Sequence, residues 1–206
     1  MKIIIPTPWF EIYISEFSDG NFRDSTIHPE ILRPHEQLHS THIHALTREN
    51  RDIPFTWVDW VYTKEKDVII GALCADCPVI ILMGDGECAI LHSGWRGTRS
   101  HIVHAGIALL ETPRDNIKVY IWPHISKESY EVRSDFFSFF PKEYFETRWE
   151  RTTFDLEKYI IDDMIGVWIR KVNITTSPID TCINRDYHSY RRDPKSGVWC
   201  VGVKMI

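Results

Sequence analysis

Short apolar runs rich in valine and isoleucine recur along the chain and predict a sheet-rich fold. Runs of this length and composition, bounded by polar or turn-forming residues, are typical of β-strands. The segment from about Ser15 to Pro34 has no such pattern and is predicted to be an irregular connection. We therefore expect a substantial sheet or a pair of sheets. The predicted strands are Lys2 to Ile5, Asp67 to Leu73, Val79 to Met83, Cys88 to His92, Lys118 to Trp122 and Val198 to Met205.

Helical spacing is found in two segments. In "FDLEKYIIDDMIGVWIRKVNI", apolar residues from Leu156 to Trp168 recur at intervals of three or four, which is the period of an amphipathic helix. Asp155 stands where an N-cap is expected, and the basic pair Arg170 and Lys171 closes the segment. A second helix is predicted from about Thr98 to Glu111, directly after a glycine-containing loop.

The turn "GDGE" between "VIILM" and "CAILH" predicts a β-hairpin, because Asp-Gly between two β-branched runs is a strong hairpin signal. Counting outward from a Met83–Cys88 pair places Val79 opposite His92. Cys77 then becomes a diagonal neighbour of His92 on the same face, about 7 to 8 Å away at the backbone. The two side chains are therefore predicted to share one ligand atom or one metal ion.

The Cys-x-x-Cys formed by Cys74 and Cys77 is a weaker signal than it first looks. In an extended chain, side chains three residues apart point to opposite faces. A redox pair normally opens a helix, whereas "PVIILM" is predicted to be a strand. A structural zinc site would need a second close Cys/His pair. Simple burial of Cys77 and His92 in the core remains an alternative.

The loop "HSGWRGT" after His92 favours a binding site over simple burial. Gly94 and Gly97 allow a turn that aims backbone N–H groups at an anion, next to the expected helix start. Arg96 would add a two-pronged donor for phosphate or carboxylate, and its alternative role is a surface ion pair.

Composition narrows the class of protein. The chain has 206 residues, 43% of them hydrophobic, so we expect residues 1–206 to form one domain. A net charge of −5 with scattered basic residues argues against nucleic acid as a partner. Prolines interrupt the apolar N-terminus, so we expect no membrane anchor and a cytoplasmic location with the five cysteines reduced.

A histidine cluster offers a third metal ligand. The segment "HEQLHSTHIH" contains His35, His39, His42 and His44, and spacing alone does not show which of them would reach Cys77 and His92.

Several motifs together resemble the YfiH family, also called the laccase-domain or polyphenol oxidase family. They are "EQLHS", "ADCPVIIL", "LHSGWRGT" and the C-terminal "DTCINRDYHSYRRDPKSGVW". The resemblance implies an α+β fold of mixed β-sheets packed in layers, with helices on the outer faces. Two departures are a shortened N-terminal region and a changed Trp122–Val132 loop, "WPHISKESYEV", which lacks the family's two glycines and two cysteines.

The resemblance also implies a site. His39, Cys77 and His92 would be the metal ligands, and Cys74 stands where the family usually has threonine. Asp76 and Cys77 would be catalytic, with Asp76 as a proton shuttle, whereas Arg96 and Arg191 would bind substrate or phosphate. The expected cofactor is Zn²⁺, with copper as a possible alternative.

The implied activity is purine nucleoside chemistry, either phosphorolysis of adenosine, inosine or methylthioadenosine, or deamination of adenosine. The expected partners are thus small molecules, a purine nucleoside and phosphate. Three alternatives stay open. They are a metal-free Cys–His hydrolase or deamidase with Cys77 as nucleophile, a copper-dependent polyphenol oxidase, and a catalytically inactive zinc-binding module.

Overall fold

The apolar runs form the strands of two mixed sheets in a computed structural model, which describes the backbone of residues 1–206 and the side chains of all residues except 4–6. The first sheet has the strand order β1-β2-β13-β6-β3 and the second has the order β12-β9-β7-β8-β5-β4. The first contains β1 (Lys2–Thr7), β2 (Phe10–Ile14), β3 (Ile31–Leu32), β6 (Ile69–Cys74) and β13 (Trp199–Met205). The second contains β4 (Ile43–Leu46), β5 (Trp60–Thr63), β7 (Val79–Met83), β8 (Cys88–His92), β9 (Lys118–Ile121) and β12 (Ile174–Thr176).

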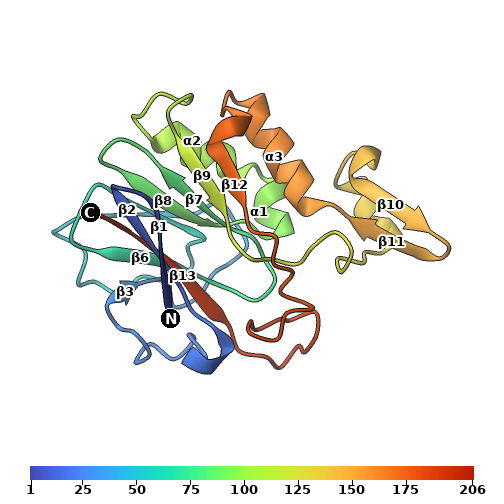
Figure 1. Cartoon of the computed structure of the whole chain (residues 1–206), viewed down its shortest axis with the longest axis horizontal. Helices are drawn as coiled ribbons and strands as arrows, with labels where there is room; N and C mark the ends of the chain where they lie inside the picture. Colours follow the sequence, from blue (N-terminus) through green and yellow to red (C-terminus); the bar gives the residue numbers. More distant parts are fainter.

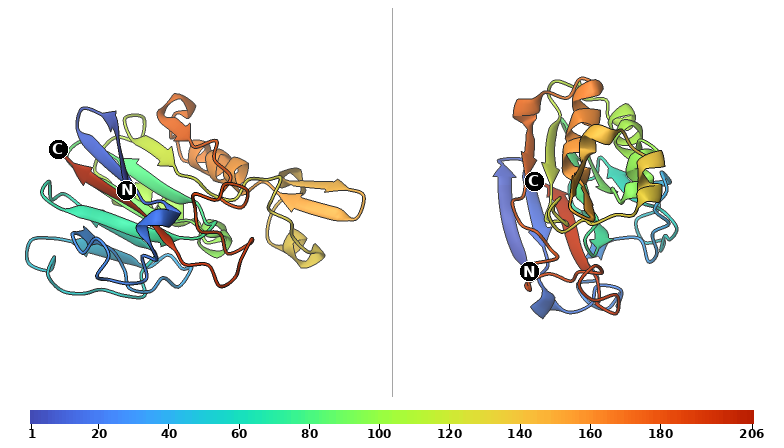
Figure 2. Two further views of the ribbon diagram at one scale, coloured as in Figure 1. Left: turned by 60° about the horizontal axis from the view of Figure 1, so that its bottom comes forward. Right: turned by 90° about the vertical axis from the view of Figure 1, so that its right-hand side faces the viewer.

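The molecule is layered, with the two sheets packed together and the helices over the outer face of the six-stranded sheet (Figure 1 and Figure 2). Both sheets combine parallel and antiparallel pairs, such as parallel β4–β5 beside antiparallel β5–β8. This confirms the predicted fold class. The remaining elements are α1 (Trp95–Arg99), α2 (Ile102–Leu109), α3 (Leu156–Gly166), the hairpin β10 (Phe145–Arg148) and β11 (Arg151–Phe154), and 3₁₀ turns at Phe17–Asp19, Ser134–Ser138, Lys142–Tyr144 and Lys171–Asn173.

The predicted hairpin register is confirmed, because Met83 pairs with Cys88 and Val79 pairs with His92. Every residue of β7 and β8 is buried. Alternate positions face the two layers, so that Ile81 packs toward the first sheet and Ile80 packs toward the helices. Full burial of such a side chain contributes about 1.5 to 3 kcal/mol. The strands that end at the predicted site are therefore firmly anchored.

The two helix predictions had different outcomes. Asp155 caps α3 as expected, and its side chain accepts a hydrogen bond from the Lys158 backbone N–H. The predicted continuous helix over 98–111 is wrong, because it is broken at His101, whose φ is 55°. Thr98 is tied to Ser93 through its hydroxyl, whereas α2 packs against β8, so each side of the break has its own anchor.

Among the described residues, no helix could span a lipid bilayer. The longest, α3, has 11 residues, and a crossing needs about 20 apolar residues in a row.

Candidate metal centre

Three side chains from distant parts of the sequence converge at one end of the core between the sheets. Their metal-binding atoms, from His39, Cys77 and His92, all lie within 4.8 Å of one another. Cys77 stands in the bend before β7, His92 is the last residue of β8, and His39 lies in the loop between β3 and β4. The two imidazole rings meet edge to face at 4.7 Å. Of the clustered histidines, His39 is thus the one brought to Cys77 and His92.

The backbone around these ligands is closely packed. His39 adopts a left-handed conformation with φ 58°, which costs a residue other than glycine about 1 to 2 kcal/mol. Gly94 leaves the space that this loop needs, because a Cβ there would lie 2.8 Å from Cδ2 of His39 and 3.1 Å from Sγ of Cys77. Glycine at position 94 is therefore required by close approach, and its predicted role of only permitting an anion-binding turn was incomplete.

Asp59 was not predicted, yet it organises two of the three ligands. Its carboxylate accepts hydrogen bonds from the backbone N–H groups of His39 and Ser40, both at 2.7 Å, and from the Ser40 hydroxyl at 2.7 Å. Its Oδ1 atom also lies 3.2 Å from Nδ1 of His92. A carboxylate behind a histidine fixes the ring and leaves its other nitrogen for the metal. The sequence signal was an acidic residue inside the aromatic run "FTWVDWVY", where a buried charge needs a partner.

The electrostatics of the centre favour a thiolate. Burial by itself would raise the pKa of Cys77, but the charge of His92 and hydrogen bonds with His39 and His92 outweigh it and lower the pKa to about 6. Burial would lower the pKa of His92, but Cys77 and Asp59 raise it to about 9. Burial would raise the pKa of Asp59, yet hydrogen bonds with His92 and Ser40 bring it to about 2.

The donor set fits a zinc-type ion. One thiolate sulfur and two imidazole nitrogens are preferred ligands of Zn²⁺, and three protein ligands leave one tetrahedral position for water or substrate. The buried Asp59 carboxylate behind His92 supplies the second layer that such sites usually have.

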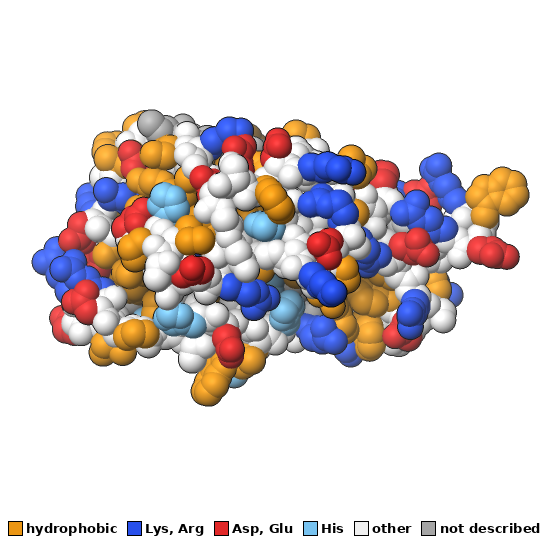
Figure 3. Space-filling model, turned by 90° about the horizontal axis from the view of Figure 1, so that it is seen from below, with side chains coloured by type: hydrophobic (Ala, Val, Ile, Leu, Met, Phe, Trp, Pro, Cys, Tyr) orange, Lys and Arg blue, Asp and Glu red, His pale blue; other side chains and the backbone are white. Residues whose placement is uncertain are grey.

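The ligands open onto a cavity of about 610 Å³, a size suited to a small molecule. Asp76, Arg96 and Arg191 line it together with the three ligands, so every predicted site residue reaches the same space. Arg96 stacks on its neighbour Trp95, with its guanidinium carbon 4.3 Å from the ring centroid. On the face seen from below, Lys and Arg side chains gather in the right half among scattered acidic ones (Figure 3).

Asp76 connects the cavity to the C-terminal segment. Its carboxylate accepts hydrogen bonds from the Thr181 hydroxyl at 2.7 Å, the Ser189 hydroxyl at 3.0 Å and the Arg191 backbone N–H at 2.6 Å. Both oxygens are thus already engaged, which favours a positioning role for Asp76. Its predicted role as a proton shuttle stays a prediction.

The changed Trp122–Val132 loop still forms part of the cavity wall. Ile125 and Tyr130 line the cavity, and the guanidinium of Arg191 donates to the Glu131 carbonyl at 2.8 Å. The loop is therefore fastened to a predicted substrate-binding residue.

Cys74 belongs to the core. It ends β6 of the first sheet and is 2% exposed, and burial raises the pKa of its thiol. The predicted reason for separating it from Cys77 was strand parity, but the chain instead leaves one sheet at Cys74 and enters the other at Val79.

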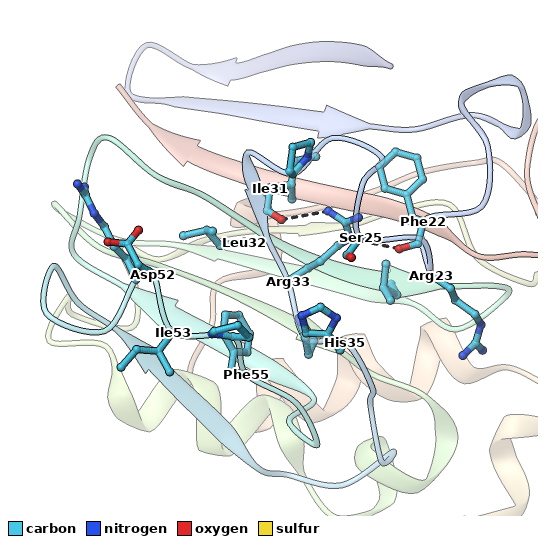
Figure 4. Close-up of a pocket in the computed structure, with 15 residues that line it drawn as sticks. Phe22, Arg23, Ser25, Ile31, Leu32, Arg33, His35, Asp52, Ile53 and Phe55 are labelled. Carbon is cyan, nitrogen blue, oxygen red and sulfur yellow. Dashed lines mark hydrogen bonds between the residues drawn. The ribbon is translucent and has the colours of Figure 1, made fainter.

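A smaller pocket of about 300 Å³ adjoins the cavity and shares Arg23, His35 and Leu73 with it. Arg33 lines this pocket, but its guanidinium donates to the backbone carbonyls of residues 22, 24, 27, 28 and 31. Figure 4 shows the bonds to Phe22 and Ile31. The charge of Arg33 is thus used to hold the loop between β2 and β3. The larger cavity, which contains the metal-ligand set, is the candidate functional site.

Comparison with known proteins agrees with the motifs. The sequence profile of the family described as multi-copper polyphenol oxidoreductase laccase matches residues 22–205. A purine nucleoside phosphorylase from Aquifex aeolicus is 31% identical over 70% of this chain and 69% of that protein. Adenosine deaminase RL5 from an unknown prokaryotic organism is 29% identical over 49% of this chain and 40% of that protein. The crystal structure of the hypothetical protein YfiH from Bacillus licheniformis has the same fold, with a TM-score of 0.83, 16% identity and 99% coverage of both chains.

Proposed function

The chain belongs to the multi-copper polyphenol oxidoreductase laccase family, the YfiH-like group that its motifs resemble, and on that premise we propose a zinc-dependent enzyme acting on purine nucleosides. The observation that carries the proposal is the His39, Cys77 and His92 cluster, which opens onto a cavity lined by two predicted anion-binding arginines. The enzyme names carried by relatives support the choice of substrate class.

His39, Cys77 and His92 would hold the metal. When bound, zinc supplies a fixed positive charge and lowers the pKa of a coordinated water to about 7. Asp59 holds the two imidazoles in position for this role, because its carboxylate contacts both the backbone N–H of His39 and the ring of His92.

For phosphorolysis, Arg96 and Arg191 would hold inorganic phosphate beside the ribose. A phosphate oxygen forms a bond to C1′ of the sugar while the bond from C1′ to N9 of the base breaks, giving ribose 1-phosphate and a purine that takes up a proton. Guanidinium groups suit this task because they bind phosphate with two parallel hydrogen bonds. For deamination, water would replace the 6-amino group of adenosine, releasing ammonia. Half-buried Tyr130 and buried Ile125 offer an apolar wall for the base.

The test combines metal analysis of the purified protein with a panel of purine nucleosides, assayed with and without phosphate. We expect the unsubstituted protein to release base or ammonia from at least one nucleoside. Cys77→Ala should lose this activity together with close to one equivalent of zinc. Elemental analysis distinguishes zinc from copper. If no base and no ammonia form from any purine nucleoside, the proposed activity is wrong. Cys182→Ala is the matched control, because its half-buried thiol lies outside the cavity lining.

A second candidate is a metal-free hydrolase with Cys77 as nucleophile, activated by His92. The lowered pKa of Cys77 beside His92 favours it. Removal of metal by a chelator separates the two mechanisms. Activity that survives complete metal removal but disappears on alkylation of Cys77 supports the nucleophile, whereas activity restored only by added zinc supports the metal enzyme.

A further inference from the structure

A second cluster of metal-binding side chains lies at the contact between α2 and α3, apart from the centre described above. His101 stands at the break between α1 and α2, His104 lies in the first turn of α2, and Asp163 lies on α3. Their ligand atoms are all within 4.8 Å of one another. The two helices lie next to each other over the six-stranded sheet (Figure 1).

Both imidazoles converge on a single carboxylate oxygen. Oδ1 of Asp163 is 3.1 Å from Nδ1 of His101 and 2.9 Å from Nε2 of His104, and the two rings are 4.7 Å apart. The Asp163 carboxylate is 11% exposed, whereas the two histidine side chains are 50% and 36% exposed. The group is therefore anchored on the inner side and open to solvent on the outer side.

His104 carries the clearest sign that a ligand is needed. Its Nε2 atom is shielded from solvent and makes no hydrogen bond among the described residues, although Asp163 Oδ1 is only 2.9 Å away. The ring nitrogen is thus directed past the oxygen. Donors of a metal site have this property, because their lone pairs point at a common ion and not at one another. A buried nitrogen without a hydrogen-bond partner otherwise destabilises the folded protein.

We propose that His101, His104 and Asp163 form a second divalent metal site. It binds Zn²⁺, and the bound ion links α2 to α3. Two imidazoles and one carboxylate are typical zinc ligands, and the exposed side leaves room for water as the fourth. Tetrahedral zinc with bonds of about 2.1 Å separates its donors by about 3.4 Å. The distances of 3.1 and 2.9 Å from the two histidines to Asp163 must therefore lengthen by about 0.3 and 0.5 Å, which is a small movement for half-exposed histidines.

This link between α2 and α3 would stabilise the layer that borders the cavity. Leu156, the first residue of α3, lines that cavity, and α1 with Arg96 precedes α2 directly. The proposal does not depend on nucleoside chemistry, because it concerns only residues outside the cavity lining.

The experiment titrates metal-free protein with zinc in a calorimeter, and then measures the melting temperature with and without zinc. The full chain should bind two Zn²⁺ ions. Asp163→Asn, which keeps the side-chain shape and an oxygen, should weaken the binding of one ion at least about tenfold, and His39→Ala should abolish the binding of the other. Zinc should still raise the melting temperature of His39→Ala, and the added Asp163→Asn substitution should abolish that rise.

Asp162→Asn is the matched control, because Asp162 lies on the same helix but contacts Lys158 and Tyr144. It should bind both zinc ions with unchanged affinity. The proposal is overturned if Asp163→Asn binds zinc as the unsubstituted protein does, or if zinc does not stabilise His39→Ala. If the His39, Cys77 and His92 centre binds no zinc, the unsubstituted protein should bind one ion, and Asp163→Asn should lose it. Failure of the proposed function can therefore be distinguished from failure of the second site.

Discussion

Substitution of Asp59 by asparagine tests whether this buried carboxylate holds the metal ligands His39 and His92 in place. The change keeps the size of a side chain that is 1% exposed, but it replaces a charged acceptor by a neutral amide. The carboxylate now serves the His39 N–H, the Ser40 N–H and hydroxyl, and Nδ1 of His92. An asparagine offers one oxygen to these groups, and its NH₂ faces other donors.

The size of the effect follows from this count. A hydrogen bond to a charged group contributes about 1.5 to 3 kcal/mol. With roughly half of the four interactions lost, the free energy of unfolding of the metal-free protein should fall by about 3 to 6 kcal/mol. Removing one partner from a buried charged pair has a similar cost of about 3 to 5 kcal/mol. Loss of a carboxylate behind a metal-binding histidine lowers metal affinity by about 10- to 100-fold.

The assays are urea unfolding of metal-free protein and competition for zinc with a chromogenic chelator, both at neutral pH. Asp85→Asn is the control, because Asp85 is exposed in the β7–β8 turn and its removal should change neither quantity. If Asp59→Asn binds zinc within about twofold of the unsubstituted protein and unfolds at the same urea concentration, the carboxylate does not organise the centre.

Three further predictions concern separate features. Gly94→Ala should lower zinc affinity in a chelator competition assay, because its Cβ would press on His39 and Cys77; unchanged affinity would show that the loop yields freely. Arg96→Ala should raise the KM for phosphate at least about tenfold while metal content stays the same; an unchanged KM excludes Arg96 from phosphate binding. Glu87→Gln, remote from the centre, should lower the free energy of unfolding by about 1 to 3 kcal/mol at neutral pH. Burial opposes ionisation of Glu87, but hydrogen bonds outweigh it and lower its pKa, so its contribution is present above the unfolded pKa and lost as pH falls through the acidic range. The difference between the Glu87→Gln variant and the unsubstituted protein should therefore shrink in acid, and a difference independent of pH would contradict this.

Local turn chemistry explains why part of the fold could be predicted in detail. The "GDGE" turn determines how its two strands pair, so the register from Val79–His92 to Met83–Cys88 was obtained from the sequence alone. The strands β4 and β5 were not predicted, because "IHAL" and "WVYT" are short and mix polar with apolar residues. Their pairing depends on neighbouring strands from distant parts of the sequence, and the local sequence pattern does not indicate which strands these are.

The same distinction between local and distant information applies to the site. Cys77 and His92 are neighbours through one hairpin, so strand geometry could join them, whereas His39 reaches them from a loop and required the family resemblance. Asp59 lies 20 residues from His39 and 33 from His92, and no spacing rule links residues so far apart. Its signal was chemical: a carboxylate inside an aromatic run is stable only when several donors meet it. A buried charge in an apolar run therefore predicts that polar partners converge on it. In this chain those partners are the loop and the strand end that carry the metal ligands.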